Sequence, residues 1–264
     1  MRLLLVAVGF VVVFATPSQA DPQPAYPVSD VDRPQLLLPG MTSLDLGLDF
    51  PTFSTASVDA NGNQVRSTTS LGEYRDLDVV VTHAVGSVQL SGRLLGEPNG
   101  ATLAANASTY LGSFPGVLEL AAEIEAPNNG STLDHNYGQS VAYHYKHHAV
   151  PRLLAILATV RVSASEWAIT PVGGMTTNAH DIYGSAGVAA DIQLLPDLAL
   201  FASTGVTVPF ESSSNITTYA PFFAGTQLQY TIGHWDLYGA LQLDDVTRSR
   251  HPYAGFGGVH RWGG

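Results

Sequence analysis

A strict alternation of side chains at residues 43–50 constrains the fold of this chain more than any other feature. Large apolar side chains take every second position, at Leu44, Leu46, Leu48 and Phe50, and small or acidic ones lie between them, at Asp45, Gly47 and Asp49. Successive side chains of a β-strand point to opposite faces, so this period of two predicts a strand with one apolar face. The same pattern recurs in many segments up to residue 262.

The spacing of these segments predicts about twelve strands, with ten or fourteen also compatible, each close to the nine to eleven residues that a tilted strand needs to cross a bilayer. Short turns are expected at Gly86-Ser87, residues 195–197 and Gly233-His234. Longer polar connections take turns with them, at residues 51–74, 126–137, 163–184, 209–219 and 244–252. Residues 163–184 are the least regular and leave a further strand or a loop open. Short turns at one end and long loops at the other are typical of transmembrane barrels.

A closed sheet explains why the pattern is repeated so often. Hydrocarbon offers no hydrogen-bond partner to backbone N–H and C=O groups, so strands persist in a bilayer only in a sheet without edges. We therefore predict an all-β fold, a closed antiparallel up-and-down transmembrane β-barrel in a single domain at residues 41–264. Closure requires the first strand to pair with the last, at residues 253–262. A soluble β-sandwich is the alternative, because alternation does not distinguish a lipid cover from a second sheet.

The N-terminal region predicts export. Arg2, an apolar run from Leu3 to Ala15 and small residues up to Ala20 have the anatomy of a signal peptide, at residues 1–20, cleaved after Ala20. The run is short for a transmembrane helix, which needs about 20 residues. Residues 21–40 contain five prolines and predict an extended periplasmic leader. The chain has no cysteine, so its stability must come from its core, a closed sheet or a membrane rather than from disulfides.

With these features the chain resembles bacterial outer-membrane β-barrel proteins of the porin-like or transporter-like kind, over nearly all of residues 33–262. The resemblance implies a location in the bacterial outer membrane, contact with its lipid, and recognition of the C-terminal strand by the barrel assembly machinery. Gly257, Phe256 and Trp262 approximate the final strand of that family. His260 departs from it, because an apolar residue is usual there.

Charged residues on the polar faces of the predicted strands are the candidate lining of the lumen. They are Asp45, Asp49, Asp78, Glu119, Glu123, Asp191 and Asp236, with Arg93, His144, Lys146 and Arg161. Their excess of carboxylates predicts a weakly cation-preferring pore. The alternative is a paired network that fills the lumen, because a barrel of about twelve strands lies between the packed eight-stranded barrels and the open ones of sixteen or more.

The sequence favours a passive channel or transporter-like protein for small solutes. A plugged structural or adhesive barrel acting through its extracellular loops is the first alternative, and a hydrolase at the rim, with Asp78 activating water, is the second. We expect no cofactor and no metal site, because His147 and His148 lie in a predicted turn while His144 points inward. The net charge of −11 argues against a nucleic-acid partner, since an acidic chain repels polyanions.

Overall fold

The computed structural model describes residues 26–51, 54–58, 64–68, 75–97, 100–127, 133–169, 176–212, 222–243 and 252–263. The strands of its large sheet are β1 (Met41–Phe50), β4 (Asp76–Val85), β5 (Val88–Glu97), β6 (Gly100–Tyr110), β7 (Val117–Pro127), β8 (Leu133–Val150), β9 (Leu154–Ile169), β10 (Thr177–Leu195), β11 (Leu198–Ser212), β12 (Phe222–Ile232), β13 (Trp235–Leu243) and β14 (Pro252–Gly263). Two short strands, β2 (Ser54–Val58) and β3 (Gln64–Thr68), form a separate antiparallel pair. None of the described residues belongs to a helix that is long and apolar enough to cross a membrane.

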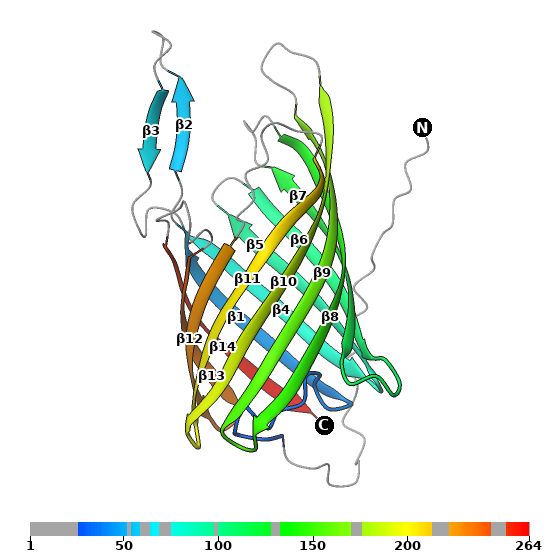
Figure 1. Cartoon of the computed structure of the whole chain (residues 1–264), viewed down its shortest axis with the longest axis vertical. Coiled ribbons are helices and arrows are strands. Elements are labelled where there is room, and N and C mark those ends of the chain that lie inside the picture. The colour runs from blue at the N-terminus through cyan, green and yellow to red at the C-terminus, as the bar shows by residue number, and fades with distance from the viewer. Residues whose placement is uncertain are drawn as a thin grey trace.

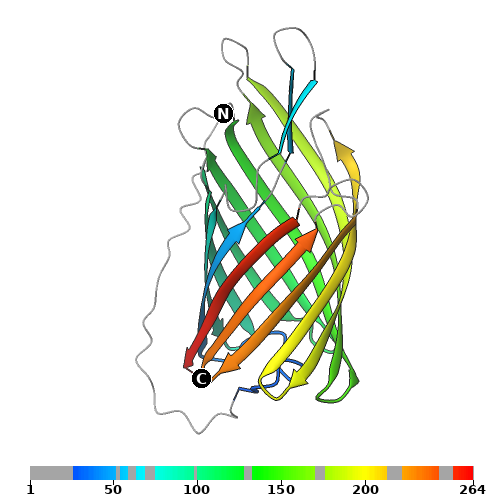
Figure 2. The same cartoon turned by 90° about the vertical axis from the view of Figure 1, so that its left-hand side faces the viewer.

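The large sheet is a closed barrel (Figures 1 and 2). Its strands follow the order β1-β14-β13-β12-β11-β10-β9-β8-β7-β6-β5-β4, and β4 pairs again with β1. The predicted closing pair is present, because β1 and β14 run antiparallel from Met41↔Gly263 to Phe50↔Ala254. The prediction of a closed antiparallel barrel of about twelve strands is therefore confirmed.

Five short connections lie at one end of the barrel, which we call the short-turn end; it is the lower end in Figure 1. They are residues 86–87, 111–116, 151–153, 196–197 and 233–234. Gly86 and Gly233 both have φ of +60°, a left-handed conformation that glycine adopts without steric cost. Because the two-residue turns at these glycines reverse the chain at once, they fix the register of the hairpins β4–β5 and β12–β13.

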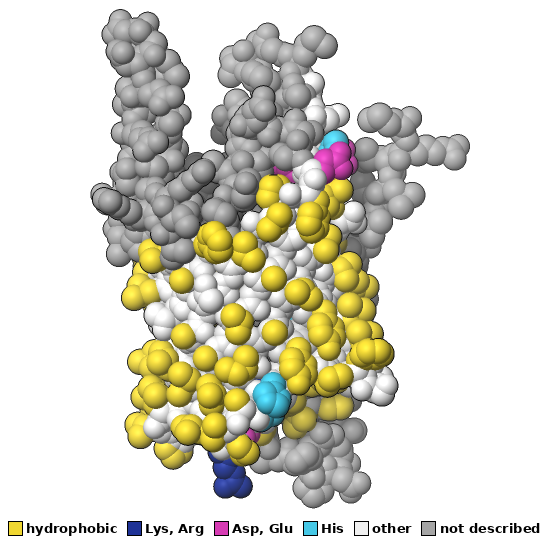
Figure 3. All heavy atoms as spheres, viewed as in Figure 1, with side chains coloured by type: hydrophobic (Ala, Val, Ile, Leu, Met, Phe, Trp, Pro, Cys, Tyr) yellow, Lys and Arg dark blue, Asp and Glu magenta, His cyan; other side chains and the backbone are white. Residues whose placement is uncertain are grey.

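The barrel wall has an apolar outer face. On β13, Leu237 and Leu241 are exposed by 50% and 58%, whereas Asp236, which points to the opposite face, is exposed by 0%. Figure 3 shows hydrophobic side chains over the visible side of the wall, with acidic and basic side chains near its two ends. The alternation that predicted the strands thus separates an apolar exterior from a polar interior.

Several strands extend farther than the sequence predicted. β9 continues to Ile169 and β10 begins at Thr177, so most of residues 163–184 is strand, and β11 continues to Ser212. β2 and β3 also lie within residues 51–74, where a loop was predicted. These extensions consist largely of polar residues, so their sequence shows no alternation that would reveal a strand. Outside the apolar band of the wall, strands can pair without an apolar face. The wall is consequently uneven in height, with 19 residues in β10 and 9 in β13 (Figure 2).

Candidate functional site in the barrel interior

Residues 26–40, which we call the N-terminal segment, lie at the short-turn end of the barrel, in blue in Figures 1 and 2. The segment bends on itself through hydrogen bonds from the N–H of Asp32 to the carbonyl of Ser29 (3.2 Å) and from the N–H of Arg33 to the carbonyl of Asp30 (3.1 Å). Val31, at the centre of this bend, is exposed by 0%. The described part of the predicted leader is therefore folded against the barrel instead of extended. Residues 1–20, the predicted signal peptide, lie outside the described residues.

Arg33 anchors the segment to strands that follow it by about two hundred positions. Its guanidinium donates to both carboxylate oxygens of Asp236, at 2.7 and 3.0 Å, and to Thr231 at 3.1 Å. It also forms an ion pair with Asp30 at 2.5 Å. Arg261 makes a second ion pair with Asp236. With Arg33 exposed by 5% and Asp236 by 0%, these charges are buried, and removing Asp236 would deprive both Arg33 and Arg261 of their shared carboxylate.

Lys146 holds the same bend from another strand. Its ammonium group donates to the backbone carbonyls of Asp30 at 3.0 Å and Arg33 at 3.2 Å, and lies 3.5 Å from the carboxylate of Asp191. Gln193 accepts hydrogen bonds from Ser29 and from the N–H of Asp30. Three of the predicted lumen residues, Lys146, Asp191 and Asp236, are thus engaged in a network around the chain's own N-terminal segment.

The partners of the segment come from widely separated strands, so the segment crosses the mouth of the barrel. β8, β10 and β13 supply the contacts above, Gln229 on β12 donates to Asp30 at 2.8 Å, and Gln89 on β5 accepts from the N–H of Leu37 at 2.9 Å. The ring of Tyr26 lies 5.1 Å from the guanidinium carbon of Arg261 on β14. Burial raises the pKa of the Tyr26 phenol, which keeps it neutral at physiological pH. The N-terminal segment therefore narrows the short-turn end.

A tyrosine–carboxylate cluster lies on the strands that meet where the sheet closes. Tyr238 on β13 donates to Asp45 on β1 at 2.9 Å, although β14 runs between these strands. Tyr253 on β14 donates in the same way to Asp49. The neutral hydroxyls solvate these two carboxylates without neutralising their charge.

On the neighbouring strands Asp78 and Arg93 form a two-pronged ion pair, with both nitrogen–oxygen distances at 2.8 Å. Both carboxylate oxygens of Asp78 are engaged by the guanidinium. This pairing leaves Asp78 poorly placed to act as a general base.

A second charged cluster spans β6 to β9. Glu119 on β7 pairs with Arg161 on β9 at 3.0 Å and lies 3.8 Å from the ring nitrogen of His144 on β8. Asn106 on β6 donates to the same carboxylate at 3.4 Å. Glu123 is the exception: it is solvent-exposed, and within the described part of the chain no cation pairs with it. The interior thus contains both paired charges and carboxylates that no cation neutralises.

The histidines near residue 145 do not converge on one point. His144 hydrogen-bonds Thr159 at 3.0 Å, whereas the ring of His147 stacks on Tyr145. Among the described residues no group of three or more ligating side chains could hold a metal ion.

Five further residues belong to the interior and were not predicted from the sequence: Asp30, Arg33, Tyr238, Tyr253 and Arg261. The two tyrosines and Arg261 carried a usable signal, because each follows the alternation at a position on the polar face of its strand. The role of the eleven predicted residues as a pore lining stays a prediction.

The fold matches outer-membrane barrels of known structure. The translocator domain of the autotransporter NalP from Neisseria meningitidis superposes with a TM-score of 0.54 and 14% identity, over 86% of this chain and 90% of that one. An outer-membrane channel from Pseudomonas putida F1 superposes with a TM-score of 0.55 and 14% identity, over 86% of this chain and 97% of that one. No protein-family model matches the sequence, and no curated protein matches it. At such low identity the likeness establishes the fold alone.

Proposed function

We propose that this protein is an integral outer-membrane barrel that serves as a passive channel for small solutes. The observation that carries the proposal is the two-faced wall: a closed sheet whose outer face is apolar and whose inner face holds carboxylates such as Asp45 and Glu123. An apolar exterior suits lipid, and a polar interior suits water and solutes. The similar barrel from Pseudomonas putida is itself described as an outer-membrane channel, which supports the same role here.

The topology supports a definite orientation and route of assembly. In outer-membrane barrels the short turns face the periplasm, so we place the N-terminal segment at the periplasmic mouth. Residues 1–20 would direct export and be removed after Ala20. Phe256 and Trp262 are exposed on the outer face of β14, by 54% and 45%, where the barrel assembly machinery would recognise them.

Electrical recording tests the channel directly. The protein, folded from its mature chain into planar lipid bilayers, should give stepwise ionic currents. The variant Arg33→Gln, which weakens the hold on the N-terminal segment, should give larger steps than the parent. Complete absence of current from both proteins at every voltage would refute the channel. The matched control is Arg152→Gln, a change in the exposed β8–β9 turn, which should leave the step size unchanged.

The network around Arg33 also supports a second candidate function, that of a plugged barrel that acts through its long loops. In that case the segment is a permanent structural part of the wall, and Arg33→Gln would lower stability without raising conductance. The recordings above separate the two, since a plug that never leaves predicts no current in either protein.

A rim hydrolase receives less support from the same geometry. Both carboxylate oxygens of Asp78 accept from Arg93, an arrangement that occupies lone pairs which a general base would need. We therefore propose a non-enzymatic protein, and expect Asp78→Asn to leave any hydrolytic background of the preparation unchanged.

A further inference from the structure

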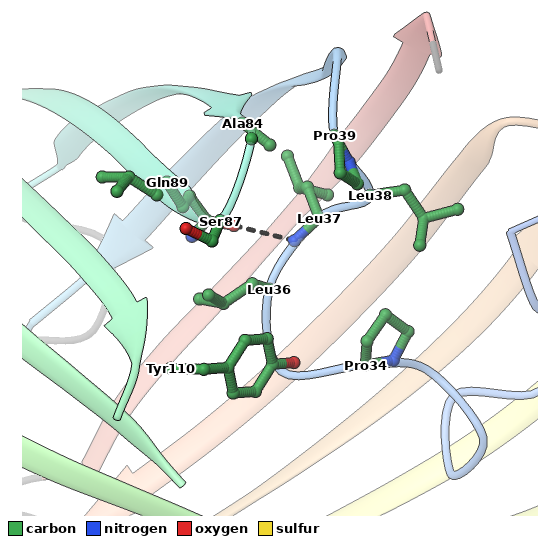
Figure 4. Close-up of a pocket in the computed structure, with 11 residues that line it drawn as sticks. Pro34, Leu36, Leu37, Leu38, Pro39, Ala84, Ser87, Gln89 and Tyr110 are labelled. Carbon is green, nitrogen blue, oxygen red and sulfur yellow. Dashed lines mark hydrogen bonds between the residues drawn. The ribbon is translucent and has the colours of Figure 1, made fainter. Parts of the chain in front are cut away.

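A cavity of about 290 Å³ lies between the N-terminal segment and the hairpin β4–β5 (Figure 4). One side of it consists of apolar residues of the segment, and the other of β4, β5 and β6. The lining is Pro34, Leu36, Leu37, Leu38, Pro39, Ala84, Gly86, Ser87, Val88, Gln89 and Tyr110. The segment therefore does not seal the short-turn end evenly.

The two sides of the mouth differ in chemistry. On the side of β8, β10 and β13 the segment is held by buried ion pairs of Arg33 and by Lys146. On the side of the cavity it is held by hydrogen bonds from the N–H of Leu37 to Gln89 and from the N–H of Gly40 to the carbonyl of Ala84 (2.8 Å). The cavity side thus has two neutral hydrogen bonds and an incompletely filled apolar contact, where the opposite side has buried ion pairs, so we regard the cavity side as the weaker attachment.

The lining contains no charged side chain among its eleven residues. An ion placed there would lose part of its hydration without gaining a charged partner, which is unfavourable. Apolar surface, in contrast, is favourably buried against Leu36, Pro39 and Val88. The cavity thus discriminates against ions of either sign.

Two hydroxyl groups give the cavity a polar point of attachment. The ring of Tyr110 lies beside Leu36, with its hydroxyl toward Pro34 (Figure 4), and Ser87 lies at the opposite wall. Within the described part of the chain, the hydroxyls of Tyr110 and Ser87 have no hydrogen-bond partner. An apolar pocket with a few available polar groups is the usual form of a small-molecule site.

We propose that this cavity binds an uncharged, mainly apolar small molecule with a single hydrogen-bonding group. The cavity would be an intermediate binding site on the path of that molecule past the N-terminal segment. The proposal rests on the proposed channel for its place on a route through the barrel. Size agrees with it, because an apolar cavity of about 150 Å³ already holds benzene, so a ring with one polar substituent fits here.

Binding can be measured at the cavity itself, which avoids confusion with partition into detergent. Methyl-labelled Leu and Val side chains of the folded protein are followed by NMR during titration with benzyl alcohol, toluene, benzoate and benzylammonium. Benzyl alcohol and toluene should shift the methyl signals of Leu36 and Val88 saturably, and the two ions should not. Equal saturable shifts with the ions, or no saturable shift with any probe, would overturn the proposal.

Variants locate the site. Ala84, exposed by 2%, lines the cavity, and Ala84→Leu should fill part of it and weaken both neutral probes at least about tenfold. The same change on the lipid face of β6, Ala107→Leu, should leave binding unchanged.

Tyr110→Phe should weaken the binding of benzyl alcohol about fivefold and leave that of toluene unaffected, as loss of one hydrogen bond predicts. Equal effects of Ala84→Leu and Ala107→Leu on binding would contradict the location. If Ala84→Leu does not fold, Tyr110→Phe provides the test instead. Equal losses of benzyl alcohol and toluene binding in Tyr110→Phe would then overturn the proposal.

The outcomes of the two sets of experiments are independent. Current through the barrel without saturable methyl shifts would refute the cavity site and leave the channel standing. Saturable binding in a barrel that never conducts would refute the channel, and the cavity would remain a ligand site at the short-turn end.

Discussion

At the scale of single residues, the closure of the sheet depends on small residues that let large ones lie flat on the wall. Tyr238 reaches Asp45 across β14 because Gly257 stands between them. A Cβ atom at Gly257 would come within 2.5 Å of the Tyr238 hydroxyl, whereas a Cβ at Gly239, on the adjacent strand, would meet nothing within 4 Å. The two glycines therefore have different roles although they are near each other.

We predict that Gly257→Ala destabilises the barrel by about 1–3 kcal/mol, the usual cost of overpacking, because the added Cβ would clash with the backbone carbonyl of Leu46 and with Tyr238, which must leave Asp45. Gly239→Ala should be close to neutral. The measurement is the temperature at which the compact folded band converts to the unfolded band on a gel of unheated and heated samples. Equal conversion temperatures for the two variants would contradict this account of the seam.

The sequence was sufficient to place Tyr238 on the polar face of its strand, but it did not predict its partner. That partner depends on the register of three strands, and Asp45 is 193 positions away. The ion pair of Asp78 with Arg93 is different, because both residues belong to one predicted hairpin. Local pairing can thus be inferred from alternation and turns, whereas contacts across the closing seam require the closed sheet.

At the scale of elements, the N-terminal segment is the part that the sequence described least well. Its prolines predict an extended leader, and nothing near Arg33 in the chain indicates that Asp236, 203 positions later, is its partner. The barrel strands were easier to predict because each one repeats the same two-residue period. An irregular segment has no period, so its position is determined only by the tertiary contacts that it makes.

The absence of native cysteine allows a direct test of how firmly the segment is held. A cysteine at position 31, Val31→Cys, replaces a side chain exposed by 0%, and Val28→Cys replaces one exposed by 52%. We predict slow maleimide labelling at position 31 and fast labelling at position 28. Adding Arg33→Gln should accelerate labelling at position 31 at least about tenfold, because the segment loses its charged hydrogen bonds to Asp236, each worth about 1.5–3 kcal/mol, although Arg261 still pairs with Asp236.

Position 28 provides the control in that experiment, since its labelling should hardly change when Arg33 is replaced. Fast labelling at position 31 in the otherwise unaltered chain would show that the segment is not bound to Asp236 and Lys146 in solution. The result bears on gating as well, because release of the segment would widen the short-turn end.

At the scale of the whole molecule, the charges of the interior divide into neutralised and free ones. Asp78, Glu119, Asp191 and Asp236 each have a cationic partner. Asp45 and Asp49 are held by tyrosine hydroxyls, which carry no charge. Together with Glu123 these two leave an excess of negative charge, which favours cations in a water-filled lumen.

This excess predicts a measurable ion preference. In bilayers with a potassium chloride gradient, the reversal potential should have the sign of cation selectivity, and Glu123→Gln should reduce it because one free carboxylate is lost. Glu211→Gln is the matched control, since Glu211 pairs with His180 on exposed side chains at the far end of β10 and β11. The effect should be clear near 0.1 M salt, where the Debye length is about 10 Å, and should fade at 1 M, where it is about 3 Å. Anion selectivity in the parent protein would mean that the free carboxylates do not face the conducting path.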